Sequence, residues 1–430
     1  MAKYDWSDGP ATLGAHSLAK HTILREYIER YIPILTRGGT VPLKLMLIDG
    51  FAGGGQYIVE GRGNTLHPGS PLILIDAVRT AEIRLNAMGS RKKPFSVDAS
   101  YVFVEKDPKA HAYLSAALKE HVGEDFIRER VDLRRGAFEE EIGNILDRIK
   151  ATASRRPRPI FVLDQYGYSA IPVDLIARIM TEIPTAEVFL TLAVDHIAAH
   201  ARTAGEAIGR LKIAGLLAPE LEAFLSGRRE MDEAALLSPE DRGRLMRTIQ
   251  LVLHETFAKR ARAACYTPFF ITSKNSHRSY WFLHLANSSK ANDVVKALHW
   301  SVSNHFEHFG REGTMMLGFD PTKSRDQLLL PFSFAFDDSA KARTVRALVE
   351  ELPAIFHARH RDGVSHRDLY GALCNETPAD LETLGEAVNR LCADLEFEKR
   401  GARGEERELS TKLKESDIIR IARQGRLFRR

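Results

Sequence analysis

The sequence predicts an α/β protein with a doubly wound, mostly parallel sheet. Three observations predict this fold: apolar runs alternate with helical segments, acidic residues follow the runs, and a glycine-rich turn follows the first run. At residues 45–55, a predicted strand of bulky apolar residues ends in Asp49 and is followed by Gly53, Gly54 and Gly55. Glycine permits positive φ and close approach of the backbone to a ligand, which is typical of a cradle for a nucleotide-like molecule. A tight strand-to-helix turn without a ligand is the alternative.

Four further apolar runs continue the alternation. They lie at residues 101–105, 131–133, 160–163 and 187–192. No clear strand is visible between the glycine-rich turn and Pro68, after which residues 72–88 form a predicted helix. Five strands that alternate with helices predict parallel pairing, and the ligands of such sheets gather at the carboxyl ends of the strands.

Two more apolar runs, at residues 269–272 and 280–285, flank a polar loop and predict an antiparallel hairpin at one edge of the sheet. A parallel sheet that ends in such a hairpin is the plan of class I methyltransferases. Residues 196–264 are helical in pattern and charged, so we expect a helical insertion that caps the substrate. The methyltransferase-like Rossmann domain is accordingly expected at residues 1–195 and 265–335.

Residues 336–430 predict a separate domain of the winged helix-turn-helix type. Helices expected at residues 341–351, 366–374 and 379–395 are followed by a glycine-containing hairpin, and the first helix is expected to stop before Pro353. A winged helix commonly docks DNA, but basic and acidic residues are nearly balanced here, and a helical dimerisation or protein-docking domain is the alternative. The tail is rich in arginine, at Arg420, Arg423, Arg426, Arg429 and Arg430. It is either a solvated end of the chain or an arm that contacts phosphates.

Composition bounds the class of protein. The chain has 430 residues, 44% hydrophobic and 27% charged, so two or three globular domains are expected. No apolar run approaches the ~20 residues that cross a bilayer and no secretory signal is present, so we expect a cytoplasmic protein without a membrane partner. The net charge of +4 is compatible with a polyanionic partner. Cys265, Cys374 and Cys392 lack C-x-x-C spacing, which favours buried free thiols over disulfides or a metal site.

The candidate cofactor pocket lies at the ends of the first two strands. If S-adenosylmethionine binds there, Gly53 to Gly55 pass beside its methionine moiety, Asp49 accepts from its ammonium group, and Glu105 accepts from both ribose hydroxyls. The interval between the two acids is 105 − 49 = 56 residues, against ~20 in dinucleotide folds, so an insertion must be accommodated. Further candidate cofactor contacts are Phe51, Ser70 and Phe138.

The candidate acceptor site follows the fourth strand at Asp164, Gln165 and Tyr166. An exocyclic amine is a poor nucleophile, and a carboxylate that accepts its hydrogens re-aims the lone pair, while an aromatic ring stacks on a base removed from its helix. Asp164 and Tyr166 fit these two roles, but Gln165 stands where adenine-N6 methyltransferases have a proline. A structural turn capped by Asp164 is the alternative.

Several separated motifs together resemble the three-Cys-motif partner protein family, TcmP. They lie at residues 16–24, 49–53, 69–72, 104–108 and 164–167, and in the hairpin after Pro268, and the match covers about residues 14–305. The resemblance implies a methyltransferase-like Rossmann fold. It also implies a partner protein with three clustered cysteines of iron-sulfur or radical type, which this chain's own cysteines do not form.

A weaker similarity extends to ribosomal-RNA adenine-N6 methyltransferases, which place a Lys-His pair on an N-terminal helix. It implies that Lys20 and His21 lie near the cofactor or the acceptor, whereas a basic pair on a surface helix is the alternative. The first hypothesis is therefore a methyltransferase acting on nucleic acid or a nucleobase-like group. The second is a non-catalytic module that binds nucleic acid for the three-cysteine partner. Hydrolysis is a third, with Asp195, His196 and His200 as incomplete metal ligands.

Overall fold

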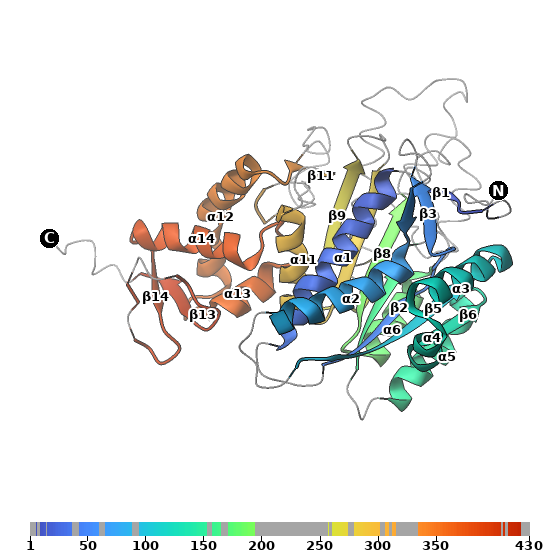
Figure 1. Cartoon of the computed structure of the whole chain (residues 1–430). Helices are drawn as coiled ribbons and strands as arrows, with labels where there is room; N and C mark the ends of the chain where they lie inside the picture. The colour runs from blue at the N-terminus through green and yellow to red at the C-terminus, as the bar shows by residue number, and fades with distance from the viewer. Residues whose placement is uncertain are drawn as a thin grey trace, which may run out of the picture. The chain divides into compact units, whose positions relative to one another are not determined.

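The computed structural model divides into two compact units. One comprises Met1–Ala264 and Pro268–Asn287, and the other Cys265–Thr267 and Ser288–Arg430 (Figure 1). Within them the structure describes residues 6, 9–13, 15–36, 43–59, 65–87, 94–152, 157–164, 171–193, 257, 260–273, 279–301, 306–308, 312–314, 334–405, 407–408 and 412–422. The helical insertion expected at residues 196–264 lies almost wholly outside these residues, and so does the tail beyond Ala422.

The main sheet of the first unit runs in the order β9-β10-β8-β7-β2-β5-β6. Its strands are β2 (Leu43–Asp49), β5 (Val97–Glu105), β6 (Val131–Arg135), β7 (Arg158–Leu163), β8 (Glu187–Ala193), β9 (Cys265–Ser273) and β10 (Ser279–Ala286). Strands β6, β5, β2, β7 and β8 pair parallel in that order, and β10 pairs antiparallel with β8. The expected doubly wound α/β sheet is confirmed. Its strand order is consistent with a methyltransferase-like Rossmann fold.

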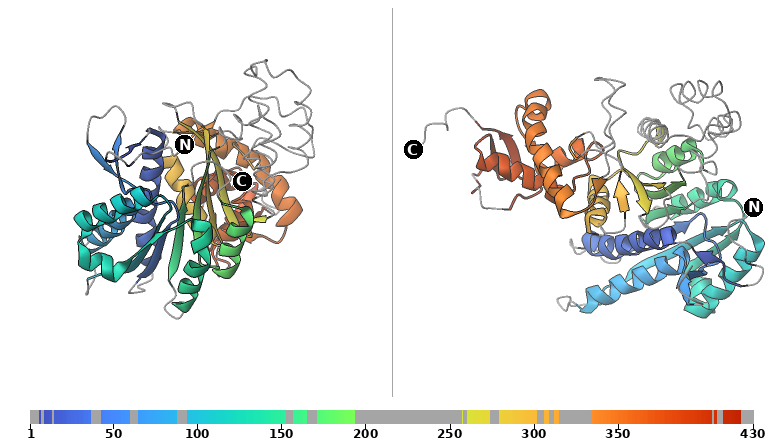
Figure 2. Two further views of the ribbon diagram at one scale, coloured as in Figure 1. Left: turned by 90° about the vertical axis from the view of Figure 1, so that its right-hand side faces the viewer. Right: turned by 90° about the horizontal axis from the view of Figure 1, so that it is seen from above.

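Helices cover both faces of this sheet. Figure 2 shows α1 and α2 over one face and α5 and α6 over the opposite face. The helices that the structure describes in the first unit are α1 (Ala15–Thr36), α2 (Ser70–Ala87), α3 (Pro108–Val122), α4 (Glu124–Arg130), α5 (Phe138–Ala151) and α6 (Val173–Glu182). Because both faces are covered, the central strands carry continuous apolar runs, as at Leu45 to Ile48 and Ile160 to Leu163. That continuity explains why these strands were visible in the sequence.

A small second sheet was missed. Strands β1 (Thr12–Leu13), β3 (Gln56–Val59) and β4 (Leu66–Pro68) form it, with β3 parallel to β1 and antiparallel to β4. The expectation of no strand before Pro68 is therefore wrong. Buried Tyr57 and Val59 alternate with half-buried Gln56 and Ile58, which is the period of a strand packed on one side. Strand β3 is too short for that pattern to stand out.

Among its described residues, the second unit combines four helices with short strands. They are α11 (Ser289–Ser301), β11 (Phe306–His308), β12 (Phe334–Ala335), α12 (Asp338–Arg359), β13 (Val364–Ser365), α13 (His366–Leu373), α14 (Leu381–Ala393), β14 (Phe397–Arg400) and β15 (Ile418–Ile421). The strands β13, β15 and β14 form an antiparallel sheet in that order. The winged-helix interpretation of this unit stays a prediction.

Helix α12 was expected to stop before Pro353, but it continues through this proline to Arg359. Proline inside a helix costs about 3 kcal/mol. Leu352 and Phe356 lie in the core at helical spacing, and burying such side chains stabilises by about 1.5–3 kcal/mol each. Burial therefore outweighs the proline.

Candidate functional site

Three acidic residues meet at the carboxyl ends of three adjacent strands. Asp49 ends β2, Glu105 ends β5, and Asp164 directly follows β7. Strand β2 lies between β5 and β7, so this edge is the point where the chain reverses its winding direction. The turn after β2 bridges both neighbours, because Gly50 N donates to Val162 O at 3.0 Å and Ala52 N donates to Val104 O at 3.0 Å. Ligands of doubly wound sheets bind at such a switch point.

Glu105 joins the glycine-rich turn to the next helix. Its Oε2 accepts from Gly53 N at 2.7 Å, and its Oε1 accepts from Asp107 N at 2.7 Å. Asp107 in turn caps the N-terminus of α3. The Glu105 side chain is half-buried, and each carboxylate oxygen can accept a second hydrogen bond. Glu105 therefore has both a structural role and spare acceptor capacity beside the turn.

The glycines of the turn are needed for packing as well as for backbone conformation. Gly53 and Gly55 have φ of +61° and +80°. A Cβ at Gly53 would lie 2.1 Å from the Tyr57 hydroxyl, and one at Gly54 would lie 2.2 Å from the Trp6 ring. The Trp6 and Tyr57 rings contact each other edge-on, with centroids 5.2 Å apart. The Trp6 and Tyr57 side chains therefore explain part of the glycine pattern, which the sequence analysis explained by a ligand alone.

Asp49 is a fully buried carboxyl group with one unmatched oxygen. Its exposed fraction is 0%. Oδ1 accepts from Phe51 N at 3.0 Å, whereas Oδ2 has no aligned donor among the described residues. Burial raises the pKa of Asp49 to about 7; the Ser70 hydroxyl and the Phe51 amide oppose the rise, while Asp164 and Glu105 add to it. The Ser70 hydroxyl acts on this carboxyl, yet within the described part of the chain Oδ2 has no partner in hydrogen-bond geometry, and a buried acid with a raised pKa is suited to a cationic ligand.

Lys20 and Asp164 form an ion pair between α1 and the end of β7. Lys20 Nζ donates to both carboxylate oxygens at 2.6 Å. Burial opposes ionisation of Asp164, but Lys20, with help from His21 and Thr191, holds the pKa of Asp164 below its usual value. The weaker family similarity drew attention to Lys20, and the structure brings it onto the candidate acceptor residue. Thr191, on β8, gave no signal in the sequence.

His21 is buried beside this pair and stacks on His67. The two ring centroids are 5.6 Å apart and the rings are nearly parallel, at 5°. Burial lowers the pKa of His21 to about 3, so its imidazole is neutral near pH 7. His67 belongs to β4, a strand too short to be recognised in the sequence, and so His67 was not recognised as a neighbour of His21.

The other candidate residues differ in position. Phe51 is half-buried and Ser70 is the first residue of α2. Phe138 is 1% exposed, and its ring lies under Gly50, with its centroid 6.2 Å from that of Phe51. Tyr166 lies outside the described residues, as do Asp195, His196 and His200. In the part of the chain that is described, no group of three or more His, Cys, Asp or Glu is placed to hold a metal ion.

The comparisons with known proteins found distant structural likenesses. No protein-family model matches the chain, and no curated protein matches it. The chain is similar to the protein LPL1258 from Legionella pneumophila, of family DUF519, at 11% identity and a TM-score of 0.34, over 64% of this chain and 90% of that one. It is also similar to PKMT2 from Rickettsia typhi, at 12% identity and a TM-score of 0.26, over 61% of this chain and 53% of that one. The α/β fold follows from the order and direction of the strands.

Of the helices that the structure describes, none is long and apolar enough to span a membrane.

Proposed function

We propose that the first unit binds S-adenosylmethionine and methylates a nucleic acid or a nucleobase-like group. The observation that carries the proposal is the unmatched oxygen of Asp49, fully buried at the switch point of a doubly wound sheet. A buried polar atom without a partner costs free energy, and a ligand that donates to it recovers that cost. S-Adenosylmethionine carries an ammonium group that can donate and two positive charges that an ionised Asp49 attracts.

The surrounding residues fit the same ligand. Glu105, beside the glycine-rich turn, has lone pairs left for two ribose hydroxyls. The cofactor, when bound, supplies a methyl group on a sulfonium that needs no further activation. The neutral imidazole of His21 adds no positive charge next to a cationic ligand. Methyl transfer from a sulfonium requires alignment and exclusion of water more than acid–base chemistry.

Asp164 is the residue we assign to the acceptor. Lys20 keeps it ionised, so its oxygens can accept hydrogens from an acceptor amine. The bidentate contact of Lys20 also restricts Asp164, because an acceptor must share those oxygens or displace the lysine. That restriction favours the second candidate function, a non-catalytic module that binds nucleic acid for a three-cysteine partner.

The second unit is proposed to serve partner binding. In a winged helix, α14 would enter the major groove of DNA. Its exposed residues include Glu382 and Glu386, and its Arg390 is already paired with Glu386 at 2.8 Å. An acidic helix is repelled by phosphates, so we favour a protein partner for this unit, such as the three-cysteine protein implied by the TcmP resemblance.

Labelled methyl transfer tests the proposal. We expect the protein to transfer radiolabelled methyl groups from S-adenosylmethionine to one of three pools, of RNA, DNA or protein, and most strongly to RNA or DNA. Asp164→Asn should reduce transfer by about 100-fold, the effect of misplacing a reacting group, while cofactor binding persists. The matched control is Asp147→Asn, whose side chain is 78% exposed on α5 and should leave transfer unchanged.

Each alternative has its own result in that experiment. Cofactor binding without transfer to any pool would support the non-catalytic module. Full transfer by a folded Asp164→Asn protein would contradict the role of Asp164, and thermal melts establish that the variants are folded.

A further inference from the structure

Two cysteines that are far apart in the sequence lie next to each other in the second unit. Tyr266 N donates to the Asn375 side-chain oxygen at 2.9 Å, which fixes the segment Cys265–Thr267 against the end of α13. Cys265 directly precedes Tyr266, and Cys374 directly precedes Asn375. The two cysteines are 374 − 265 = 109 positions apart in the sequence. Both are free and buried, with exposed fractions of 5% and 0%, and belong to the same apolar core.

The surroundings of the pair are polar on one side. Lys296, fully buried on α11, donates to the carbonyl oxygens of Cys374 and Thr377, the latter at 2.6 Å. These bonds anchor the turn between α13 and α14 and place an ammonium group close to the thiols. An adjacent cation favours a thiolate.

The two thiols differ in their tendency to ionise. The hydrogen bond from Cys265 lowers the pKa of Cys374 to about 7, against the effect of burial and with further help from Lys296. The same contact, together with burial, raises the pKa of Cys265 well above its usual value. Cys374 Sγ donates to Gly371 O at 3.4 Å as a thiol, but it ionises more readily than Cys265, which keeps its proton. A readily ionised thiol beside a second thiol is the pairing of redox-sensing cysteines, and because both thiols are buried here, the oxidant has to be as small as hydrogen peroxide.

We propose that Cys265 and Cys374 form a reversible disulfide when the protein meets a peroxide. The Cys374 thiolate attacks one oxygen of hydrogen peroxide, the O–O bond breaks, and a sulfenic acid forms as the leaving hydroxide is protonated to water. The Cys265 sulfur then attacks the Cys374 sulfur, an S–S bond forms, and the hydroxyl group leaves as a second water with the Cys265 proton. The two thiols lose two electrons, which reduce one peroxide to two waters.

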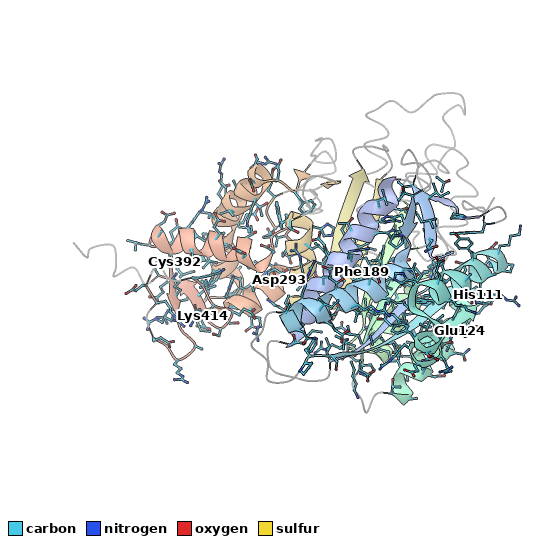
Figure 3. The ribbon with its side chains drawn as sticks, in the orientation of Figure 1. His111, Glu124, Phe189, Asp293, Cys392 and Lys414 are labelled. Atoms are coloured by element: carbon cyan, nitrogen blue, oxygen red, sulfur yellow. The ribbon has the colours of Figure 1, made fainter. Side chains whose placement is uncertain are left out.

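The third cysteine provides an internal control. Cys392 lies on α14 in the same unit (Figure 3) and is also buried. Burial raises its pKa to about 11, so it remains a thiol near pH 7. Trypsin separates the three cysteines, because they fall in the fragments 263–274, 368–390 and 391–399.

The experiment treats the intact, reduced protein with a small excess of hydrogen peroxide, blocks remaining thiols with iodoacetamide, and identifies tryptic fragments by mass spectrometry. We expect 263–274 joined to 368–390, release of the two by dithiothreitol, and at least a tenfold excess of this product over any product that contains Cys392. In Cys265→Ser, Cys374 should proceed to sulfinic acid because no resolving thiol is present. In Cys374→Ser, Cys265 should remain unmodified.

The proposal is overturned if both thiols of the folded protein stay reduced while a free-cysteine peptide is oxidised. It is also overturned if Cys392 reacts as fast as Cys374. Neither result depends on methyl transfer.

Discussion

The parent protein should lose about 2–3 kcal/mol more stability between pH 5 and pH 8 than the Asp49→Asn variant. Burial raises the pKa of Asp49 to about 7 from an ordinary value of 3.8. A raised pKa means that the protonated carboxyl favours the folded state; this contribution is complete below pH 4 and is lost as the pH rises through 7. Each pKa unit between the ordinary and the raised value corresponds to about 1.4 kcal/mol of stability. The loss takes place between these two pKa values, and about two of the roughly three units lie above pH 5.

Urea denaturation at the two pH values measures this difference. Asparagine retains the oxygen that accepts from Phe51 N but carries no charge, so its contribution should not vary with pH. Asp125→Asn is the control, because the Asp125 side chain is 85% exposed on α4. That variant should follow the parent. Identical pH profiles for Asp49→Asn and the parent would show that Asp49 is not a strained buried acid.

Glu105→Gln should weaken S-adenosylmethionine binding by about 30-fold or more. Hydrogen bonds to a charged group contribute about 1.5–3 kcal/mol each, and Glu105 is proposed to accept from two ribose hydroxyls. The variant should also lose about 1–3 kcal/mol of stability, because a glutamine has one acceptor oxygen for the amides of Gly53 and Asp107.

Calorimetric titration and urea denaturation separate these two effects. The matched control is Glu124→Gln at the start of α4 (Figure 3), whose side chain is 69% exposed. It should bind the cofactor like the parent protein. If Glu105→Gln lowers stability but leaves affinity unchanged, Glu105 serves only to fasten the glycine-rich turn, and the assignment of the ribose site fails.

The sequence predicted the main sheet well because its central strands are apolar on both faces. Runs such as residues 160–163 are typical of strands buried on both faces, and parallel topology then places the residues after each strand at one edge. Asp49, Glu105 and Asp164 came together for that reason. Their meeting follows from the parallel direction of the strands, which the alternation of strands and helices in the sequence indicates.

Other parts of the site depend on contacts between distant segments. The bond from Lys20 to Asp164 joins residues 144 positions apart, and no local pattern encodes it. His67 stacks on His21 only because a short strand, too brief to recognise, carries it there. The glycines were recognised, but the rings of Trp6 and Tyr57 that occupy the space beside them were not. Packing decided these features, and packing is a property of the whole fold.

Calorimetric titration with S-adenosylmethionine in two buffers of different ionisation enthalpy tests the central claim most directly. At pH 7, Asp49 is about half protonated, and a cationic ligand beside it should lower its pKa. We therefore predict one-to-one binding with release of up to about half a proton per cofactor, and loss of that release in Asp49→Asn. Absence of binding, or binding in which the measured heat does not depend on the buffer, would contradict the account.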